Sequence, residues 1–125
     1  MRLLLDTHVF IWSVQASRRL SAAARRMISQ ADAVYVSAAS IWEIAIKARL
    51  GKIEGDAQAL ASAIEASGFQ ELVVTSSHAA AVAKLPSHHS DPFDRLLLAQ
   101  AFSEPLHLLS ADRQLAAYGG AVTIL

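Results

Sequence analysis

Acidic side chains recur at the boundaries of the predicted strands and helices, where they could meet at one site. Asp6 follows the first apolar run of the chain and Asp112 follows the fourth. Glu43 lies about two turns into one predicted helix, and Asp94 lies in the first turn of another. In an open parallel sheet, residues just beyond the carboxyl ends of the strands converge on one crevice. We therefore expect these four carboxylates to face a common cleft.

Such a cluster needs a cation, because neighbouring carboxylates repel each other and raise each other's pKa. The sequence has no cysteine, which excludes thiolate nucleophiles and thiolate-bound zinc. None of the five histidines forms the i,i+4 helical pair typical of zinc hydrolases. Carboxylate oxygens suit Mg²⁺ or Mn²⁺, ions that can activate water and neutralise charge during phosphodiester hydrolysis. The predicted catalytic and metal-binding residues are Asp6, Glu43, Asp94 and Asp112.

Each of these acids also has a purely structural interpretation. Asp6 and Asp112 are placed to cap helices, and Asp94 would interact favourably with a helix dipole. Glu43 could form an i,i+4 ion pair with Lys47 at the surface, although apolar residues occupy most of the circumference of its helix. The prediction of a site therefore depends on the four acids together.

Three further residues are predicted to support the acids or to contact a substrate. Thr7 directly follows the first acid, and the Ser110 hydroxyl precedes the last one, where it could also serve as a simple helix cap. Arg95 is a candidate for binding a carboxylate or a phosphate through two parallel hydrogen bonds. The other basic residues, such as the pair Arg18 and Arg19, are expected to form a solvated face, some of which could steer phosphate.

Five short apolar runs rich in β-branched residues predict the strands that carry these residues. Each run except the last is followed by helical patterning, which favours an α/β fold with a parallel five-stranded sheet and helices on both faces. The predicted strands are Arg2–Leu5, Ala33–Val36, Leu72–Val74, His107–Leu109 and Val122–Leu125.

The helix boundaries carry recognisable capping residues. Ser21 and Ser37 are predicted N-caps, and Asp91 is predicted to cap a helix that begins at the following proline and runs to about Ser103. We interpret Asp91 as a cap only and do not count it as a site residue. The irregular segment 86–90 is expected to form a mobile rim.

Length and composition indicate one globular domain over residues 1–125. The formal net charge is zero, but residues 1–52 contain eight basic and three acidic residues, whereas residues 53–125 contain three basic and eight acidic ones. This polarity is compatible with a basic rim beside an acidic centre. The opening leucine run is too short for a signal peptide or a membrane span, so we expect a cytoplasmic protein without a membrane partner.

Four motifs in order along the chain resemble the VapC group of PIN-domain toxins. They are Leu-Leu-Leu-Asp6-Thr7-His8, Ser40-Ile-Trp-Glu43-Ile-Ala-Ile-Lys47, His89-Ser-Asp91-Pro-Phe-Asp94-Arg-Leu-Leu-Leu-Ala-Gln and Leu-Ser110-Ala-Asp112-Arg. The resemblance spans nearly the whole chain. One departure is Leu115, which stands where an aromatic residue is expected.

The resemblance implies a PIN domain that hydrolyses RNA with Mg²⁺ or Mn²⁺. It implies that Asp6, Glu43 and Asp94 are the central metal ligands and that Asp112 acts directly or through water. It also implies a homodimer and a toxin-antitoxin hetero-oligomer, in which a cognate antitoxin protein blocks the cleft. The products would carry 5′-phosphate and 3′-hydroxyl ends.

Three other functions use the same residues differently. One is a housekeeping PIN-type nuclease that processes RNA. Another is a non-catalytic module that binds RNA or a partner and keeps the acids as helix caps. The third is a phosphotransferase with Asp6 as a covalent nucleophile, which the histidine at position 8 disfavours because such enzymes typically carry a second aspartate there.

Overall fold

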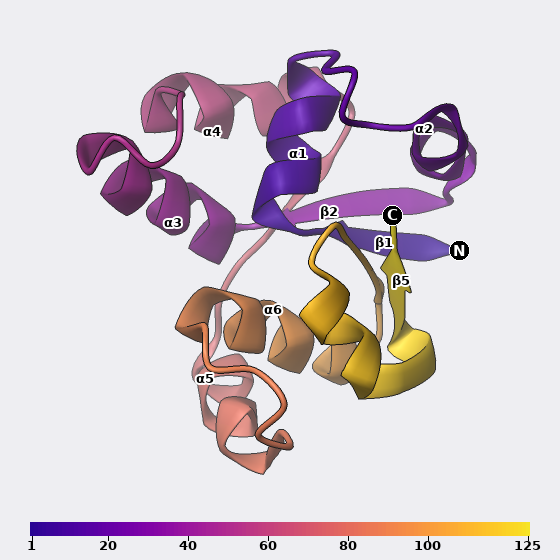
Figure 1. Cartoon of the computed structure of the whole chain (residues 1–125), viewed down its shortest axis with the longest axis vertical. Coiled ribbons are helices and arrows are strands. Elements are labelled where there is room, and N and C mark those ends of the chain that lie inside the picture. Colours follow the sequence, from indigo (N-terminus) through magenta and orange to yellow (C-terminus); the bar gives the residue numbers. More distant parts are fainter.

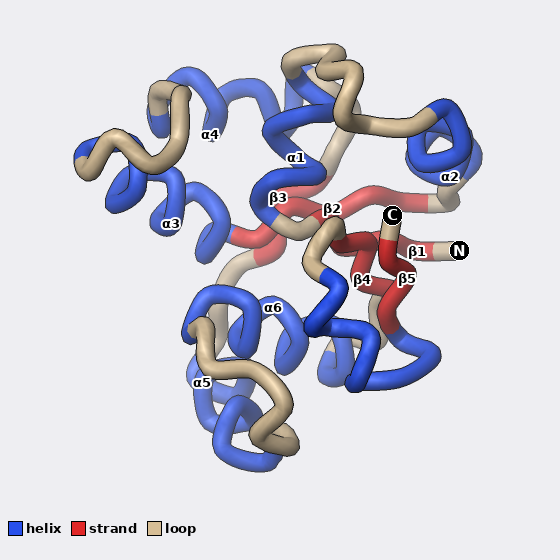
Figure 2. Tube along the Cα trace, in the orientation of Figure 1, coloured by secondary structure: helices blue, strands red, loops and turns tan.

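The computed structural model describes all residues from 1 to 125 and contains one parallel sheet. Its five strands lie in the order β3-β2-β1-β4-β5 (Figure 2). The predicted α/β class and the fully parallel pairing are therefore confirmed. The strands are β1 (Arg2–Leu5), β2 (Ala33–Ser37), β3 (Gln70–Leu72), β4 (His107–Ser110) and β5 (Val122–Ile124).

Helices cover both faces of this sheet, as expected for a parallel sheet with crossover connections. In Figure 1, α1 to α4 lie above the sheet, whereas α5, α6 and the C-terminal helical turns lie below it. No helix has the length and apolar character that a membrane span requires. The helical elements are α1 (Thr7–Val14), α2 (Ala22–Gln30), α3 (Ala38–Arg49), α4 (Ala57–Ala66), α5 (Ser76–Ala81), α6 (Pro92–Ser103) and the 3₁₀ segments η1 (Val82–Lys84) and η2 (Arg113–Ala121).

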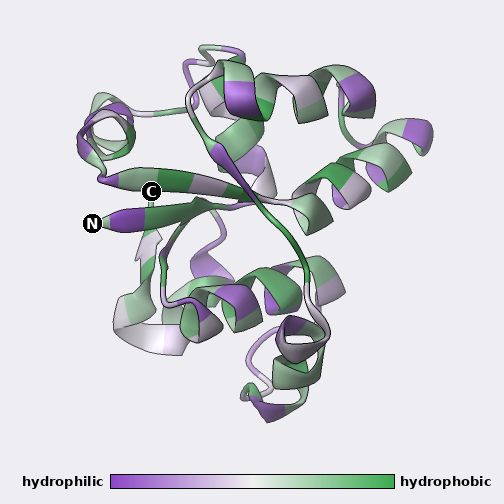
Figure 3. Cartoon of the chain, turned by 180° about the vertical axis from the view of Figure 1, so that it is seen from behind, coloured by the Kyte–Doolittle hydropathy of each residue, from purple (hydrophilic) through white to green (hydrophobic).

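The two-residue period of the strands divides the apolar core between these layers. Leu3 and Leu5 of β1 pack on the side of α1, α3 and α4, and Leu4 packs on the side of α6. All three leucines are fully buried, and each contributes about 1.5–3 kcal/mol relative to an exposed position. Figure 3 shows hydrophobic colour along the strands and a mixture of both colours around the helices, as expected for helices with one buried face.

The predicted helix boundaries agree with the observed caps. The hydroxyls of Ser21 and Ser37 accept hydrogen bonds from the first-turn amides of α2 and α3. Asp91 caps α6 through two amides, and this helix ends at Ser103 as predicted. Gly51, which follows α3, has a φ of 74°, a conformation that disfavours residues with a Cβ.

The third strand differs from its predicted position by two residues. The β-branched pair Val73 and Val74 predicts a strand there, but β3 ends at Leu72, where its pairing with Ser37 of β2 also ends. Val73 and Val74 lie beyond the sheet and are exposed. Strand propensity identified this run, but the end of the neighbouring strand set its limit.

The strand order creates a crevice beside the carboxyl ends of β1 and β4. These strands are neighbours, but the chain leaves β1 into α1 on one face, whereas β4 continues into η2 on the other. The amide of Asp6 donates to the carbonyl of Leu109 at 3.0 Å, so the two strand ends remain together at this point. The strand order reverses between β1 and β4, and open α/β sheets bind ligands at the carboxyl ends of the strands where this happens.

Candidate active site

A polar cavity of about 430 Å³ opens at the carboxyl ends of β1 and β4. Carboxylates from four separate segments of the chain line it. Few of its lining residues are apolar, and basic side chains stand among the acids. All four acids singled out from the sequence line this cavity: Asp6, Glu43, Asp94 and Asp112.

Asp6 both caps α1 and faces the cavity. Its Oδ1 accepts from the amide of Val9 at 2.8 Å, and its Oδ2 accepts from the Ser110 hydroxyl at 2.5 Å and from the amide of Ala111 at 3.3 Å. Burial raises the pKa of Asp6 above its ordinary value, although these hydrogen bonds and the charge of His8 act in the opposite direction. The two interpretations from the sequence are therefore compatible, because a carboxylate can accept about four hydrogen bonds or ligands.

Glu43 is buried in α3 and is held from two sides. The Thr7 hydroxyl donates to its Oε1 at 2.5 Å, and the ammonium of Lys47 contacts its Oε2 at 2.5 Å. The i,i+4 pair considered from the sequence exists, but it lies at the cavity and Glu43 is only 4 % exposed. Burial lowers the pKa of Lys47, but the hydrogen bond and charge of Glu43, with two more acids nearby, raise it overall.

Asp94 and Asp112 are joined by a histidine from the segment before α6. The Nε2 atom of His89 lies 2.8 Å from Oδ2 of Asp94 and 3.4 Å from Oδ2 of Asp112. Asp112 also caps η2 through the amide of Gln114, and its own amide donates to the Ser110 hydroxyl at 3.0 Å. Ser110 thus connects the first acid to the last.

Burial and the nearby acids together raise the proton affinity of Asp94. Burial, with a smaller contribution from the charges of Asp91, Asp6 and Glu43, raises the pKa of Asp94 to about 6, although the hydrogen bond from His89 acts in the opposite direction. Burial lowers the pKa of His89, but Asp94 and the other nearby acids raise it above its ordinary value. Without a metal ion, the site therefore favours proton uptake or cationic neighbours.

Arg95 lies away from the cavity, which differs from the expectation that it binds a carboxylate or phosphate. Its guanidinium donates to the carbonyls of Pro86 and His89 at 3.1 Å each and to that of Val82 at 3.2 Å. The Tyr118 hydroxyl donates to the Pro86 carbonyl at 2.9 Å. These contacts tie the predicted rim, segment 86–90, to α6 and η2.

Sequence reasoning missed three polar residues of this region. Lys47 was interpreted as a surface partner, Asp91 only as a cap and His89 only as part of a rim. Asp91 lines the cavity, and its Oδ2 lies 3.9 Å from the ammonium of Lys47. The one available signal was spacing, because His89 and Asp91 precede Asp94 within a single motif.

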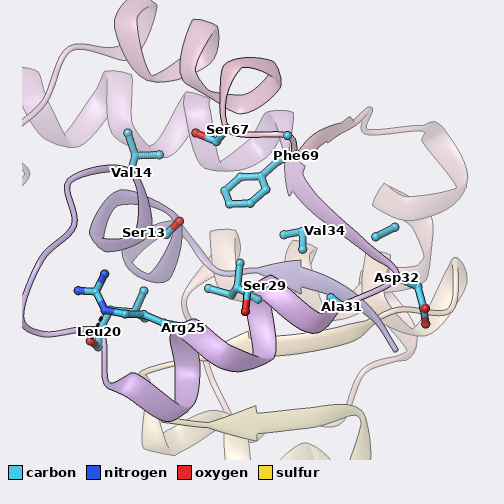
Figure 4. A pocket seen from close by; sticks show the side chains of 13 residues that line it. Ser13, Val14, Leu20, Arg25, Ser29, Ala31, Asp32, Val34, Ser67 and Phe69 are labelled. Atoms are coloured by element: carbon cyan, nitrogen blue, oxygen red, sulfur yellow. Dashed lines mark hydrogen bonds between the residues drawn. The ribbon is translucent and has the colours of Figure 1, made fainter.

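Another hollow of about 520 Å³ lies near the amino-terminal end of β2 (Figure 4). It is lined by the apolar side chains of Val14, Val34 and Phe69, together with Arg25 and Asp32. Arg25 is engaged with the carbonyl of Leu20, and no group of acids converges there. The acidic cavity is therefore the better candidate for chemistry.

Comparison with known proteins identifies the family. The family model of the PIN domain matches residues 3–121. The chain belongs to the PIN-domain family. It is 36% identical over 114 residues to Ribonuclease VapC22 of Mycobacterium tuberculosis (strain ATCC 25618 / H37Rv), covering 90% of this chain and 88% of that protein. This PIN domain is thus VapC-like, as the four motifs indicated.

Solved structures share the fold of this PIN domain at lower identity. A toxin-antitoxin complex from Klebsiella pneumoniae matches with a TM-score of 0.68 and 19% identity, covering 97% of this chain and 95% of that one. VapBC2 from Rickettsia felis, bound to a promoter DNA fragment, matches with a TM-score of 0.67 and 11% identity, covering 100% and 98%. These likenesses support the sheet order and helix layers described above.

The side chains at the cavity fit a divalent metal ion. His89, Asp94 and Asp112 each offer a ligand atom, and these atoms all lie within 4.8 Å of one another. Asp94 and Asp112 line the acidic cavity together with Asp6 and Glu43, but the latter two are not part of this compact group. Oxygen and imidazole ligands without thiolate are the set that hard and borderline divalent ions accept.

Proposed function

We propose that this VapC-like PIN domain is a metal-dependent ribonuclease that hydrolyses RNA phosphodiester bonds and serves as the toxin of a toxin-antitoxin pair. The observation that carries this proposal is the convergence of four acids from four separate segments on one polar cavity. Such crowding is costly without a cation, and burial together with the neighbouring acids raises the pKa of Asp94. The relative with 36% identity is named a ribonuclease, which supports the same reaction.

Mg²⁺ or Mn²⁺ is the ion that we assign to this site. Asp6, Glu43, Asp94 and Asp112 would hold it, because carboxylates are the ligands that these ions prefer. The ion would supply activation of water and neutralisation of charge at the leaving oxygen. The hydroxyls of Thr7 and Ser110 would keep two of the carboxylates oriented, since they donate to Glu43 and Asp6.

The basic and aromatic groups of the cavity would bind the RNA. Lys47 and Arg19 line it, so their charges can hold phosphates beside the acids. His8 and Trp12 also line it with ring centroids 5.9 Å apart, which offers a surface on which a nucleobase can stack. Trp12 is partly buried against the core, and the proposal gives it a second use in substrate binding.

We extend the proposal to a protein partner and a second copy of the chain. The structural neighbours include toxin-antitoxin complexes, which supports a cognate antitoxin that covers the cavity. The outer face of α3 and its C-cap carry Trp42, Ile46 and Leu50 at four-residue intervals, and all three are exposed. An exposed apolar stripe on a helix supports a contact with a second copy or an antitoxin helix.

A cleavage assay with purified protein tests the ribonuclease. We expect Mg²⁺ or Mn²⁺ to be required, EDTA to stop cleavage, and Asp94→Asn to abolish it. Asp56→Asn is the matched control, because Asp56 is an exposed acid that caps α4 away from the cavity and asparagine caps equally well. The product ends should be 5′-phosphate and 3′-hydroxyl. Cleavage in excess EDTA that leaves 2′,3′-cyclic phosphates would contradict the proposal.

The same preparation separates the alternative functions. RNA binding that is indifferent to EDTA and to Asp94→Asn, without cleavage, would favour a non-catalytic module. The product of a short reading frame next to the gene is the candidate antitoxin protein to test. Cleavage that this protein does not inhibit would favour a housekeeping nuclease. Inhibition by such a protein at equimolar ratio, together with growth arrest on expression of the chain alone, is the result expected for a toxin.

A further inference from the structure

A histidine stands where the acidic cavity meets the segment before α6. His89 shares a separate shallow hollow with neighbours such as Ser87 and Gln114, and only its Nε2 reaches the acids. The side chain is mostly buried, with 10% of its surface exposed. Its two carboxylate partners come from different elements, Asp94 from the first turn of α6 and Asp112 from the turn after β4.

The distances from His89 to the two acids are close to those between neighbouring ligands around one ion. Nε2 of His89 lies 2.8 Å from Oδ2 of Asp94 and 3.4 Å from Oδ2 of Asp112. Adjacent ligands of an octahedral ion with bonds of about 2.1 Å are about 3.0 Å apart. One ion could therefore take the place of the proton between His89 and Asp94 with only small movements of the side chains. Asp6 and Glu43 lie outside this compact group.

The backbone that carries His89 is fixed to the same helix as Asp94. The guanidinium of Arg95 donates to the carbonyls of His89 and Pro86, and Tyr118 donates to Pro86 as well. His89 is thereby presented to the acids before any ion binds. A site whose ligands are held in place by their surroundings loses less entropy when it binds.

We propose that His89 is a direct ligand of the divalent ion, through Nε2, together with Asp94 and Asp112. This inference rests on the proposed metal-dependent function and refines its ligand set. An imidazole nitrogen is a poor partner for Mg²⁺ and a better one for transition metals. His89 therefore biases the site toward Mn²⁺, and Arg95 is a positioning residue that acts through it.

The competing role for His89 is a hydrogen bond that merely orients Asp94. His89→Gln separates the two roles, because a glutamine amide near the position of Nε2 can still donate to Asp94 but is a weak metal ligand. His88→Gln is the matched control, because the His88 ring packs on Tyr118 with centroids 5.2 Å apart and does not line the acidic cavity. His8→Gln controls for the histidine that lines that cavity.

Pulsed electron paramagnetic resonance of full-length protein loaded with Mn²⁺ tests ligation directly. We expect a nitrogen hyperfine coupling to Mn²⁺ in the wild type, in His88→Gln and in His8→Gln, and its loss in His89→Gln. Calorimetric titration should show Mn²⁺ affinity reduced about 10-fold or more in His89→Gln, with Mg²⁺ affinity changed by less than about 3-fold. Arg95→Lys should weaken the coupling while the far-ultraviolet circular dichroism stays that of the wild type.

The inference and the proposed function can fail separately. Absence of nitrogen coupling in the wild type, or its persistence in His89→Gln, overturns the role of His89 even if RNA is cleaved. Equal loss of Mg²⁺ and Mn²⁺ affinity in His89→Gln also overturns it, because that result indicates orientation of Asp94 without ligation. A coupling that depends on His89 in a protein that cleaves no RNA supports the ligand and contradicts the ribonuclease.

Discussion

Replacing Asp94 with asparagine should stabilise the metal-free protein while it removes activity. Asp94 is held among other acids, and its pKa is raised by burial and by their charges to about 6, from 3.8 in the unfolded chain. Its ionised form is therefore unfavourable in the folded state without a cation. Asparagine has nearly the same shape and no charge, so it removes both the cost of burying the charge and the repulsion from the other acids.

The size of the effect follows from the change in proton affinity. A difference between 3.8 and about 6 corresponds to about 3 kcal/mol, since each tenfold change in affinity is worth about 1.4 kcal/mol. Loss of the hydrogen bond between His89 and the Asp94 carboxylate offsets part of this gain. We expect Asp94→Asn to raise the free energy of unfolding by about 1–3 kcal/mol at pH 7.5, or the melting temperature by about 4–12 °C.

The stability difference between the two proteins should depend on pH in one direction only. The folded protein binds the Asp94 proton more tightly than the unfolded chain does, so the wild type loses stability as the pH rises from about 4 to about 6. The asparagine variant has no such titration. The stability difference between the two proteins should therefore be near zero at pH 4 and complete above pH 6.

Urea denaturation in EDTA at several pH values measures this difference. Asp56→Asn is again the control and should follow the wild type at every pH, because Asp56 is exposed and remote from the cavity. Saturating Mn²⁺ should reverse the order by stabilising only the wild type. The electrostatic reasoning is refuted if Asp94→Asn in EDTA is no more stable than the wild type at pH 7.5, or if its advantage is the same at pH 4.

Three further predictions concern other parts of the molecule. Ser110→Ala removes the hydroxyl that donates to Asp6, so it should lower the free energy of unfolding by about 1–3 kcal/mol and weaken Mn²⁺ binding about 10-fold, measured by urea denaturation and calorimetry. Leu98→Ala leaves a cavity in the fully buried core beneath the sheet and should cost about 2–5 kcal/mol; a change below 1 kcal/mol in a thermal melt would contradict that packing. Leu50→Glu places a charge on the exposed stripe of α3 and should shift a homodimer to monomer in light scattering, with unchanged circular dichroism; an unaltered dimer would exclude this face.

Local patterns were sufficient to predict the fold class, most strands and the helices with clear caps. Short apolar runs rich in β-branched residues gave four of the five strands within one residue. Helix α6 begins at the predicted proline after Asp91 and ends at Ser103, as predicted. These features are local because caps and strand patterns depend on neighbours within about four residues. The four acids were found for the same reason, since each stands next to an element boundary or within a recognisable motif.

The role of each polar residue depended on contacts that only the folded chain creates. The sequence alone leaves open whether Asp6 caps a helix or faces a site. In the structure it caps α1 and also faces the cavity, where the hydroxyl of Ser110, 104 residues further along the chain, donates to it. Arg95 stands beside Asp94 in sequence, yet its guanidinium turns to the carbonyls of Pro86 and His89. Which residue a polar side chain contacts depends on which distant segments the sheet brings together. Local sequence patterns cannot predict that pairing.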